Sequence, residues 1–133
     1  MRIAELMQTE VHTIPPDARV SDAATTLADA RVSALPVVDD GGGLVGVISA
    51  TDILALEEES EGEQSRGRVL DQTAVRDVMT PEPQTISPDA DIREAARRML
   101  EGDVHRLIVI ANGRMVGVIS TTDIIRAVAA GQL

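Results

Sequence analysis

The chain of 133 residues lacks cysteine, lysine, phenylalanine, tyrosine and tryptophan altogether. Without cysteine it has no disulfide, no thiolate metal site and no cysteine nucleophile. Without lysine it has neither Schiff-base nor P-loop lysine chemistry. Without an aromatic ring from these residues, a bound base must be held by aliphatic side chains.

Long apolar runs are also missing, although 44% of the residues are hydrophobic. No run approaches the roughly 18 residues of a membrane span, and the first residues lack the apolar core of a signal peptide. The net charge of −10 disfavours nucleic acid and anionic lipid as partners. We therefore expect a soluble, cytoplasmic protein that binds neither nucleic acid nor a membrane.

An internal repeat organises the chain. Residues 13–18 recur as residues 85–90, and residues 46–53 recur as residues 117–124. The offset falls from 72 to 71 residues between the two blocks. The change lies at a glycine-rich turn, where a length difference is tolerated.

Each half contains the same elements in the same order. A proline-containing extended segment precedes a helix, predicted over 20–30 and 92–101 from its apolar spacing. Two short β-branched strands then form a hairpin, marked in the second half by Asn112-Gly113. A closing helix follows, over 51–56 and 122–130. Asp91 is a typical helix-capping residue and Arg19 is not. We therefore expect a capping side chain at the start of the helix over 92–101 but not at the start of the helix over 20–30.

The pattern predicts an α/β (α+β) fold of two tandem β-α-β-β-α repeats. Neither repeat is long enough to bury much surface alone, so we expect them to pack about a pseudo-twofold axis. The predicted domains are a first repeat over 1–56, an acidic flexible linker over 57–72 and a second repeat over 73–133. The linker is assigned from its polar and charged composition.

Each half carries Ser-x-x-Asp between a strand and a helix, at Ser49 and Asp52 and again at Ser120 and Asp123. From spacing alone this is a helix cap, with a hydroxyl at the first position and a carboxylate in the first turn. The same groups could instead hold a ligand, because a carboxylate accepts hydrogen bonds from neighbouring hydroxyls. Spacing does not choose between the two roles.

The ordered set of motifs resembles the CBS repeat, present twice. It comprises Met7 and Met79, the runs at 35–39 and 107–110, and the closing blocks at 46–54 and 117–125. The resemblance implies a regulatory module that catalyses nothing and requires no cofactor. It also implies that AMP, ADP, ATP or S-adenosylmethionine binds in the inter-repeat clefts, and that the module signals to a separate protein. The sequence does not identify that protein.

The resemblance also implies roles for individual residues. Ribose and phosphate would meet the Ser-x-x-Asp motifs and their neighbours, and the base would meet the extended segments and an aliphatic slot. The implied residues are Ser49, Thr51, Asp52, Ser120, Thr122 and Asp123 for ribose and phosphate, Thr13, Ile14, Thr85 and Ile86 for the base, and Val37, Val47, Val109 and Val118 for the slot.

The pair His105-Arg106 is similar to a His-Arg pair that meets phosphates in the nucleotide-binding subunit of AMP-activated kinase. The first half has Ser33-Ala34 at this place, so we expect the two clefts to differ. His12 is expected at the surface. No nucleophile–base pattern or metal-ligand set is visible, although Mg²⁺ could accompany a bound nucleotide.

A homodimer is expected as well, because the helices present apolar residues that one small repeat pair would leave exposed. The residues are Ala23, Ala24, Ala95, Ala96, Ile124, Ile125 and Val128. The alternative to a ligand sensor is a structural dimerisation module that binds no ligand. The two complete Ser-x-x-Asp motifs favour the sensor.

Overall fold

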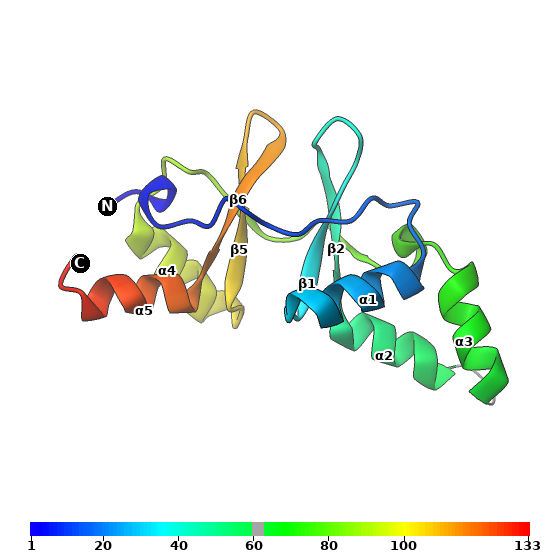
Figure 1. Cartoon of the computed structure of the whole chain (residues 1–133). Helices are drawn as coiled ribbons and strands as arrows, with labels where there is room; N and C mark the ends of the chain where they lie inside the picture. The colour runs from blue at the N-terminus through cyan, green and yellow to red at the C-terminus, as the bar shows by residue number, and fades with distance from the viewer. Residues whose placement is uncertain (60–62) are drawn as a thin grey trace. The chain divides into compact units, whose positions relative to one another are not determined.

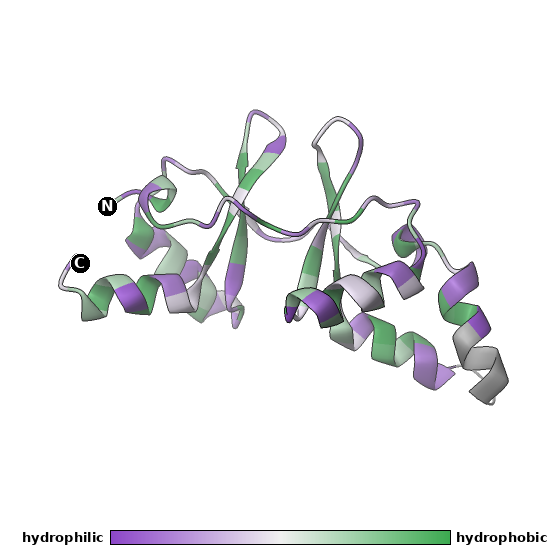
Figure 2. Ribbon diagram, in the orientation of Figure 1, coloured by the Kyte–Doolittle hydropathy of each residue, from purple (hydrophilic) through white to green (hydrophobic). Residues whose placement is uncertain are grey.

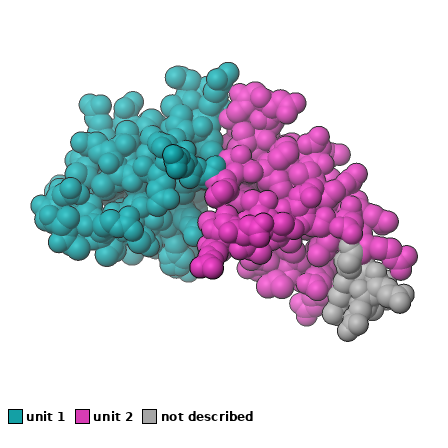
Figure 3. All heavy atoms as spheres, viewed as in Figure 1, with its two compact units in different colours: residues 1–11, 84–133 teal, residues 12–83 magenta. Residues whose placement is uncertain are grey.

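The computed structural model describes residues 1–59 and 63–133 and divides into two compact units (Figures 1 and 3). Unit 1 comprises Met1–Val11 and Gln84–Leu133, and unit 2 comprises His12–Pro83. The units are therefore not the contiguous halves expected from the sequence. The first residues of each repeat belong to the unit built mainly from the other repeat.

Unit 2 consists of a strand hairpin with its helices (Figure 1). Its elements are α1 (Val20–Ala30), β1 (Ala34–Val38), β2 (Leu44–Ser49), α2 (Ala50–Glu59), α3 (Glu63–Gln72), the 3-10 turn η2 (Val75–Asp77) and β3 (Thr80–Pro81). Unit 1 has the corresponding parts. They are the 3-10 turn η1 (Ile3–Glu5), β4 (Thr85–Ile86), α4 (Ile92–Gly102), β5 (Arg106–Ala111), β6 (Arg114–Ser120) and α5 (Thr121–Ala129).

The two sheets are built in the same way. In unit 2 the order is β1-β2-β3, with a parallel bridge from Ile14 to Val37 on the outer side of β1. In unit 1 the order is β4-β5-β6, with an antiparallel bridge from Gln8 to Val118 on the outer side of β6. Each hairpin thus pairs with the segment before its own first helix. It also pairs with the opening segment of the other repeat, which is residues 1–11 in unit 1 and residues 73–83 in unit 2.

The helices agree closely with the sequence prediction. Helix α1 has the expected bounds, α4 is one residue longer, and α2 and α5 each begin one residue earlier. Asp91 caps α4 by accepting a hydrogen bond from the backbone N–H of Arg93 at 2.8 Å. Helix α1 lacks a capping side chain at Arg19, as expected, but the Asp22 carboxylate accepts the Arg19 N–H at 3.2 Å.

The predicted linker differs from the structure. Within 57–72 the chain continues α2 to Glu59 and forms α3, while residues 60–62 lie outside the described residues. Glutamate, glutamine, arginine and leucine are good helix formers, which a reading of this stretch as merely polar overlooks. Leu56 on α2 and Leu70 on α3 pack against the core of unit 2. This apolar contact joins much of the expected linker to the unit.

Each unit has its own aliphatic core, and the strands appear as apolar segments in Figure 2. The first hairpin strand contributes three consecutive buried residues in both units, at 35–37 and 107–109, as the continuous apolar runs predict. Ile3 of the N-terminal segment is completely buried in the core of unit 1. Val75 is completely buried in the core of unit 2. The opening segments, each exchanged into the unit of the other repeat, therefore contribute to the cores as well as to the sheets.

Candidate functional site

The junction between β6 and α5 places Ser120 and Asp123 in a reciprocal cap. The Ser120 Oγ accepts the backbone N–H of Asp123 at 3.2 Å. One Asp123 oxygen, Oδ2, accepts the Ser120 N–H and the Ser120 hydroxyl, both at 2.9 Å. The capping interpretation of the motif is therefore confirmed in unit 1.

The other Asp123 oxygen is occupied from outside the cap. The Gln8 side-chain amide donates to Oδ1 at 3.1 Å, and Arg126 Nη1 lies 3.7 Å from the same atom. The Asp123 side chain is only 4% exposed. A buried carboxylate must be paired or hydrogen-bonded to persist in its charged form, and both oxygens meet this requirement here. Neither oxygen is open to a ligand in this conformation.

The junction between β2 and α2 repeats the cap with a more accessible carboxylate. Asp52 Oδ2 accepts the Ser49 N–H at 2.9 Å, and Ser49 Oγ accepts the Asp52 N–H at 3.1 Å. Asp52 is half-buried. Over residues 1–59 and 63–133, its carboxylate makes no hydrogen bond to a residue other than Ser49. Its second oxygen is thus available to a hydroxyl donor.

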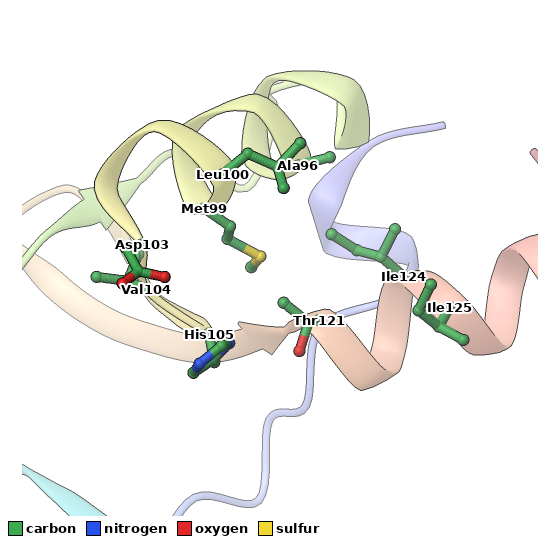
Figure 4. Close-up of a pocket in the computed structure, with 9 residues that line it drawn as sticks. All are labelled: Ala96, Met99, Leu100, Asp103, Val104, His105, Thr121, Ile124 and Ile125. Atoms are coloured by element: carbon green, nitrogen blue, oxygen red, sulfur yellow. The ribbon is translucent and has the colours of Figure 1, made fainter.

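The two predicted phosphate residues are neighbours at the start of β5. Arg106 is exposed at the start of β5 and pairs across the hairpin with Ser120. The corresponding pair in unit 2 is Ala34 and Ser49, so alanine takes the place of Arg106 there. His105 lines a pocket between α4 and α5 (Figure 4). His105 precedes the strand, which begins at Arg106.

The predicted base-binding residues are divided between core and surface. Ile14 and Val37 are buried in the core of unit 2, and Ile86 and Val109 are buried in the core of unit 1. These four side chains therefore present no free apolar face. The remaining predicted residues are at least partly accessible. Thr13, Thr51 and Thr122 are exposed, while Val47, Thr85 and Val118 are half-buried.

Unit 1 contains an apolar pocket of about 290 Å³ between its two helices. Figure 4 shows Leu100 on α4 and Ile125 on α5 at this pocket, and they are 84% and 64% exposed. The lining residues are Ala96, Met99, Leu100, Asp103, Val104, His105, Thr121, Ile124 and Ile125. Three residues of the predicted dimer face, Ala23, Ala95 and Ile124, instead belong to the cores of their own units.

Gln8 belongs to none of the motifs recognised in the sequence. It lies 115 residues from Asp123 along the chain, so no local spacing connects them. The sequence points to Gln8 only indirectly, through the repeat. Gln8 follows Met7 and Thr80 follows Met79, so the two residues occupy corresponding positions. The two repeats therefore differ at this position.

The charge is also divided unevenly between the units. Unit 2 contains 14 acidic and 5 basic residues, a net charge of −9, whereas unit 1 contains 8 acidic and 7 basic residues, a net charge of −1. An anionic ligand therefore meets far less repulsion near unit 1. Among the side chains that the structure describes, no group of three acidic or histidine residues is arranged to hold a metal ion.

Two similar units, each ending its hairpin in a Ser-x-x-Asp helix cap, define a tandem-repeat α/β module. The CBS domain family model matches residues 3–59 and 75–130, and the chain belongs to this family. The mixed fold expected from the sequence is confirmed by solved CBS-pair structures.

Relatives of known sequence include plant and bacterial CBS proteins. The chain is 32% identical to the chloroplastic protein CBSX2 of Arabidopsis thaliana over 88% of its length, which spans 58% of that relative. It is 28% identical to YhcV of Bacillus subtilis, covering 92% of this chain and 81% of YhcV. A third relative is an enzyme, the inosine-5'-monophosphate dehydrogenase of Methanocaldococcus jannaschii. It is 32% identical over 92% of this chain, which matches 22% of the enzyme.

The relatives of this chain include chloroplastic proteins. The cytoplasmic location expected from the sequence is therefore still a prediction. Among the described helices, none has the length and apolarity needed to cross a bilayer.

Solved CBS structures superpose on almost the whole of this chain. The crystal structure of CBSX2 in complex with AMP superposes with a TM-score of 0.83 at 30% identity, covering 99% of this chain and 98% of that one. The CBS domain pair of MJ0100 contains 5'-methylthioadenosine and S-adenosyl-L-methionine. It superposes with a TM-score of 0.80, covering 98% of both chains, but at 21% identity it supports the fold alone.

Proposed function

We propose that this chain is a regulatory module that binds an adenosine-containing ligand at its Ser-x-x-Asp junctions and signals to a separate protein. The observation that carries the proposal is the same cap geometry in both units, with an accessible carboxylate oxygen on Asp52. The AMP complex of CBSX2, which is 30% identical over nearly the whole chain, supports this choice of ligand.

The chemistry of the junction suits a nucleoside. A carboxylate can accept hydrogen bonds from the adjacent hydroxyls of a ribose, and the start of a helix favours negative charge. Asp52 or Asp123 would hold the sugar, and Arg106 would hold a phosphate in unit 1, because its guanidinium matches phosphate oxygens. AMP, ADP and ATP are the candidate ligands for that unit.

Unit 2 has neither a cation at the corresponding position nor a favourable net charge. Its junction suits an uncharged or cationic adenosine compound better than a nucleotide. S-adenosylmethionine is the candidate of this kind among the ligands implied by the family.

A thermal-shift screen with AMP, ADP, ATP, S-adenosylmethionine and NAD tests the proposal. A ligand present at 100 times its dissociation constant should stabilise the folded protein by about 2.7 kcal/mol. We expect stabilisation by at least one of the first four compounds. If none of them raises the unfolding temperature at millimolar concentration, the sensor proposal is overturned.

The second candidate is a structural homodimer, favoured by the apolar pocket and the exposed Leu100 and Ile125 of unit 1. We propose a second copy as the occupant of this face because the charges are complementary. Exposed Arg93 and Arg97 lie one turn or less from the pocket residues on α4, whereas α2 of unit 2 ends in Glu57–Glu59. Unit 1 of one copy would contact unit 2 of the other. A dimer that binds no adenosine compound would favour the structural role alone.

A further inference from the structure

Gln8 and Thr80 occupy the same position in the two sheets. Gln8 forms an antiparallel bridge with Val118 on β6, and Thr80 pairs antiparallel with Val47 on β2. Val118 and Val47 are themselves corresponding residues of the repeat. The two opening segments therefore present Gln8 and Thr80 at matching positions of the two sheets.

The side chains at this position give the two carboxylates different surroundings. Gln8 donates to Asp123 Oδ1 at 3.1 Å, and Asp123 is 4% exposed. Thr80 is exposed and, within the described chain, makes no hydrogen bond to Asp52, which is half-buried. The difference between amide and hydroxyl thus coincides with a closed carboxylate in unit 1 and an open one in unit 2.

A glutamine amide and a ribose hydroxyl offer the same group to a carboxylate, a polar hydrogen. On the basis of the proposed function, we infer that Gln8 competes with ribose for Asp123. An adenosine ligand then binds unit 1 only by displacing the Gln8 side chain, whereas Asp52 accepts ribose directly. Gln8 and Thr80 are the residues that set this difference between the sites.

The displacement requires only a side-chain rotation. The Gln8 backbone is bonded to Val118 in both directions at 2.9 Å, and these bonds do not involve the amide side chain. Arg126, 3.7 Å from the same carboxylate oxygen, can continue to neutralise Asp123 when Gln8 leaves. The opening segment can therefore stay paired with β6 while the ligand enters.

Exchanging the two residues tests the inference, with one site silenced at a time. In an Asp52→Ala background, Gln8→Thr should tighten the binding of AMP and of adenosine about tenfold, because the ligand no longer has to break a hydrogen bond to a charged acceptor. In an Asp123→Asn background, Thr80→Gln should weaken both ligands at unit 2. Titration calorimetry gives the dissociation constants, and circular dichroism checks that each variant is folded.

A spectroscopic measurement on the parent protein adds an independent readout. Loss of a side-chain amide signal in Gln8→Thr assigns the Gln8 resonance, and saturating AMP should then shift it and speed its exchange with water. If AMP binds the parent and both backgrounds but neither exchange changes the affinity, Gln8 does not compete with ribose and the inference is overturned. If none of AMP, ADP, ATP, adenosine and S-adenosylmethionine binds any of these proteins, the proposed function itself is overturned.

Discussion

Gly117 and Gln8 approach so closely that a Cβ at Gly117 would lie 2.6 Å from the Gln8 carbonyl oxygen. The corresponding Cβ at Gly46 would lie 2.8 Å from the Thr80 carbonyl oxygen. In both units the glycine of the hairpin strand leaves room for the opening segment of the other repeat. The glycine repeated in the sequence is therefore a packing requirement of the exchanged segments.

Gly117→Ala and Gly46→Ala should each destabilise the fold, because the added methyl group meets backbone that cannot rotate away. Over-packing of this kind costs about 1–3 kcal/mol. Gly41→Ala is the matched control, since its Cβ would meet only an Asp39 side-chain oxygen at 3.5 Å. Urea denaturation measures the free energy of unfolding. Equal stability of all three variants would show that the opening segments do not need this space.

Asp123→Ala should destabilise the protein more than Asp52→Ala. The first change removes a buried carboxylate that accepts hydrogen bonds from the Gln8 amide and from the Ser120 N–H and hydroxyl, at a cost of about 1–3 kcal/mol. The second removes a cap at a half-buried position, where water can partly replace the lost hydrogen bond to the Ser49 N–H. The same denaturation experiment compares the two. A larger loss for Asp52→Ala would contradict the burial difference on which the comparison depends.

Asp52→Ala should also weaken adenosine binding by about 1.5–3 kcal/mol, because hydrogen bonds from ribose to a charged acceptor are lost. Asp29→Ala, at an exposed position on α1, controls for the change in net charge. Titration calorimetry with adenosine measures both. If the two variants bind adenosine equally well, Asp52 acts as a helix cap only.

Arg106→Ala should lower the affinity for AMP far more than the affinity for adenosine, since only AMP carries the phosphate that the guanidinium recognises. Arg114→Ala is the control, because it removes an exposed arginine at the other end of the same hairpin. Calorimetry at fixed salt keeps long-range screening constant. Equal losses of affinity for AMP and adenosine would show that Arg106 does not bind the phosphate.

Leu100→Glu and Ile125→Glu should each convert a dimer to a monomer, because both place a charge on the apolar face of unit 1. Leu133→Glu changes an apolar residue that is 46% exposed at the chain end, and it should leave the dimer intact. Sedimentation velocity across micromolar concentrations measures the oligomeric state. A parent protein that is monomeric throughout would overturn the proposed dimer.

Much of the local structure was predictable from the sequence. Apolar spacing located α1 at its observed bounds, and the β-branched runs located both hairpins. Ser-x-x-Asp predicted the caps, since all the groups of a helix cap lie within four residues of one another. The exception is the stretch at 57–72, whose charged composition indicates a linker, although its glutamate, glutamine, arginine and leucine residues also favour the helix α3.

The sequence by itself determined what depends on neighbouring residues: the repeat, its helices, its hairpins and its caps. Only the tertiary structure decided which opening segment completes which sheet, and therefore that Gln8 reaches Asp123 across 115 residues of chain. The reason is physical. A sheet edge accepts any strand with free backbone groups, and both opening segments place a methionine, Met7 or Met79, against a hairpin glycine. Because these local contacts are alike, they do not choose the pairing, which depends on contacts between residues far apart in the sequence.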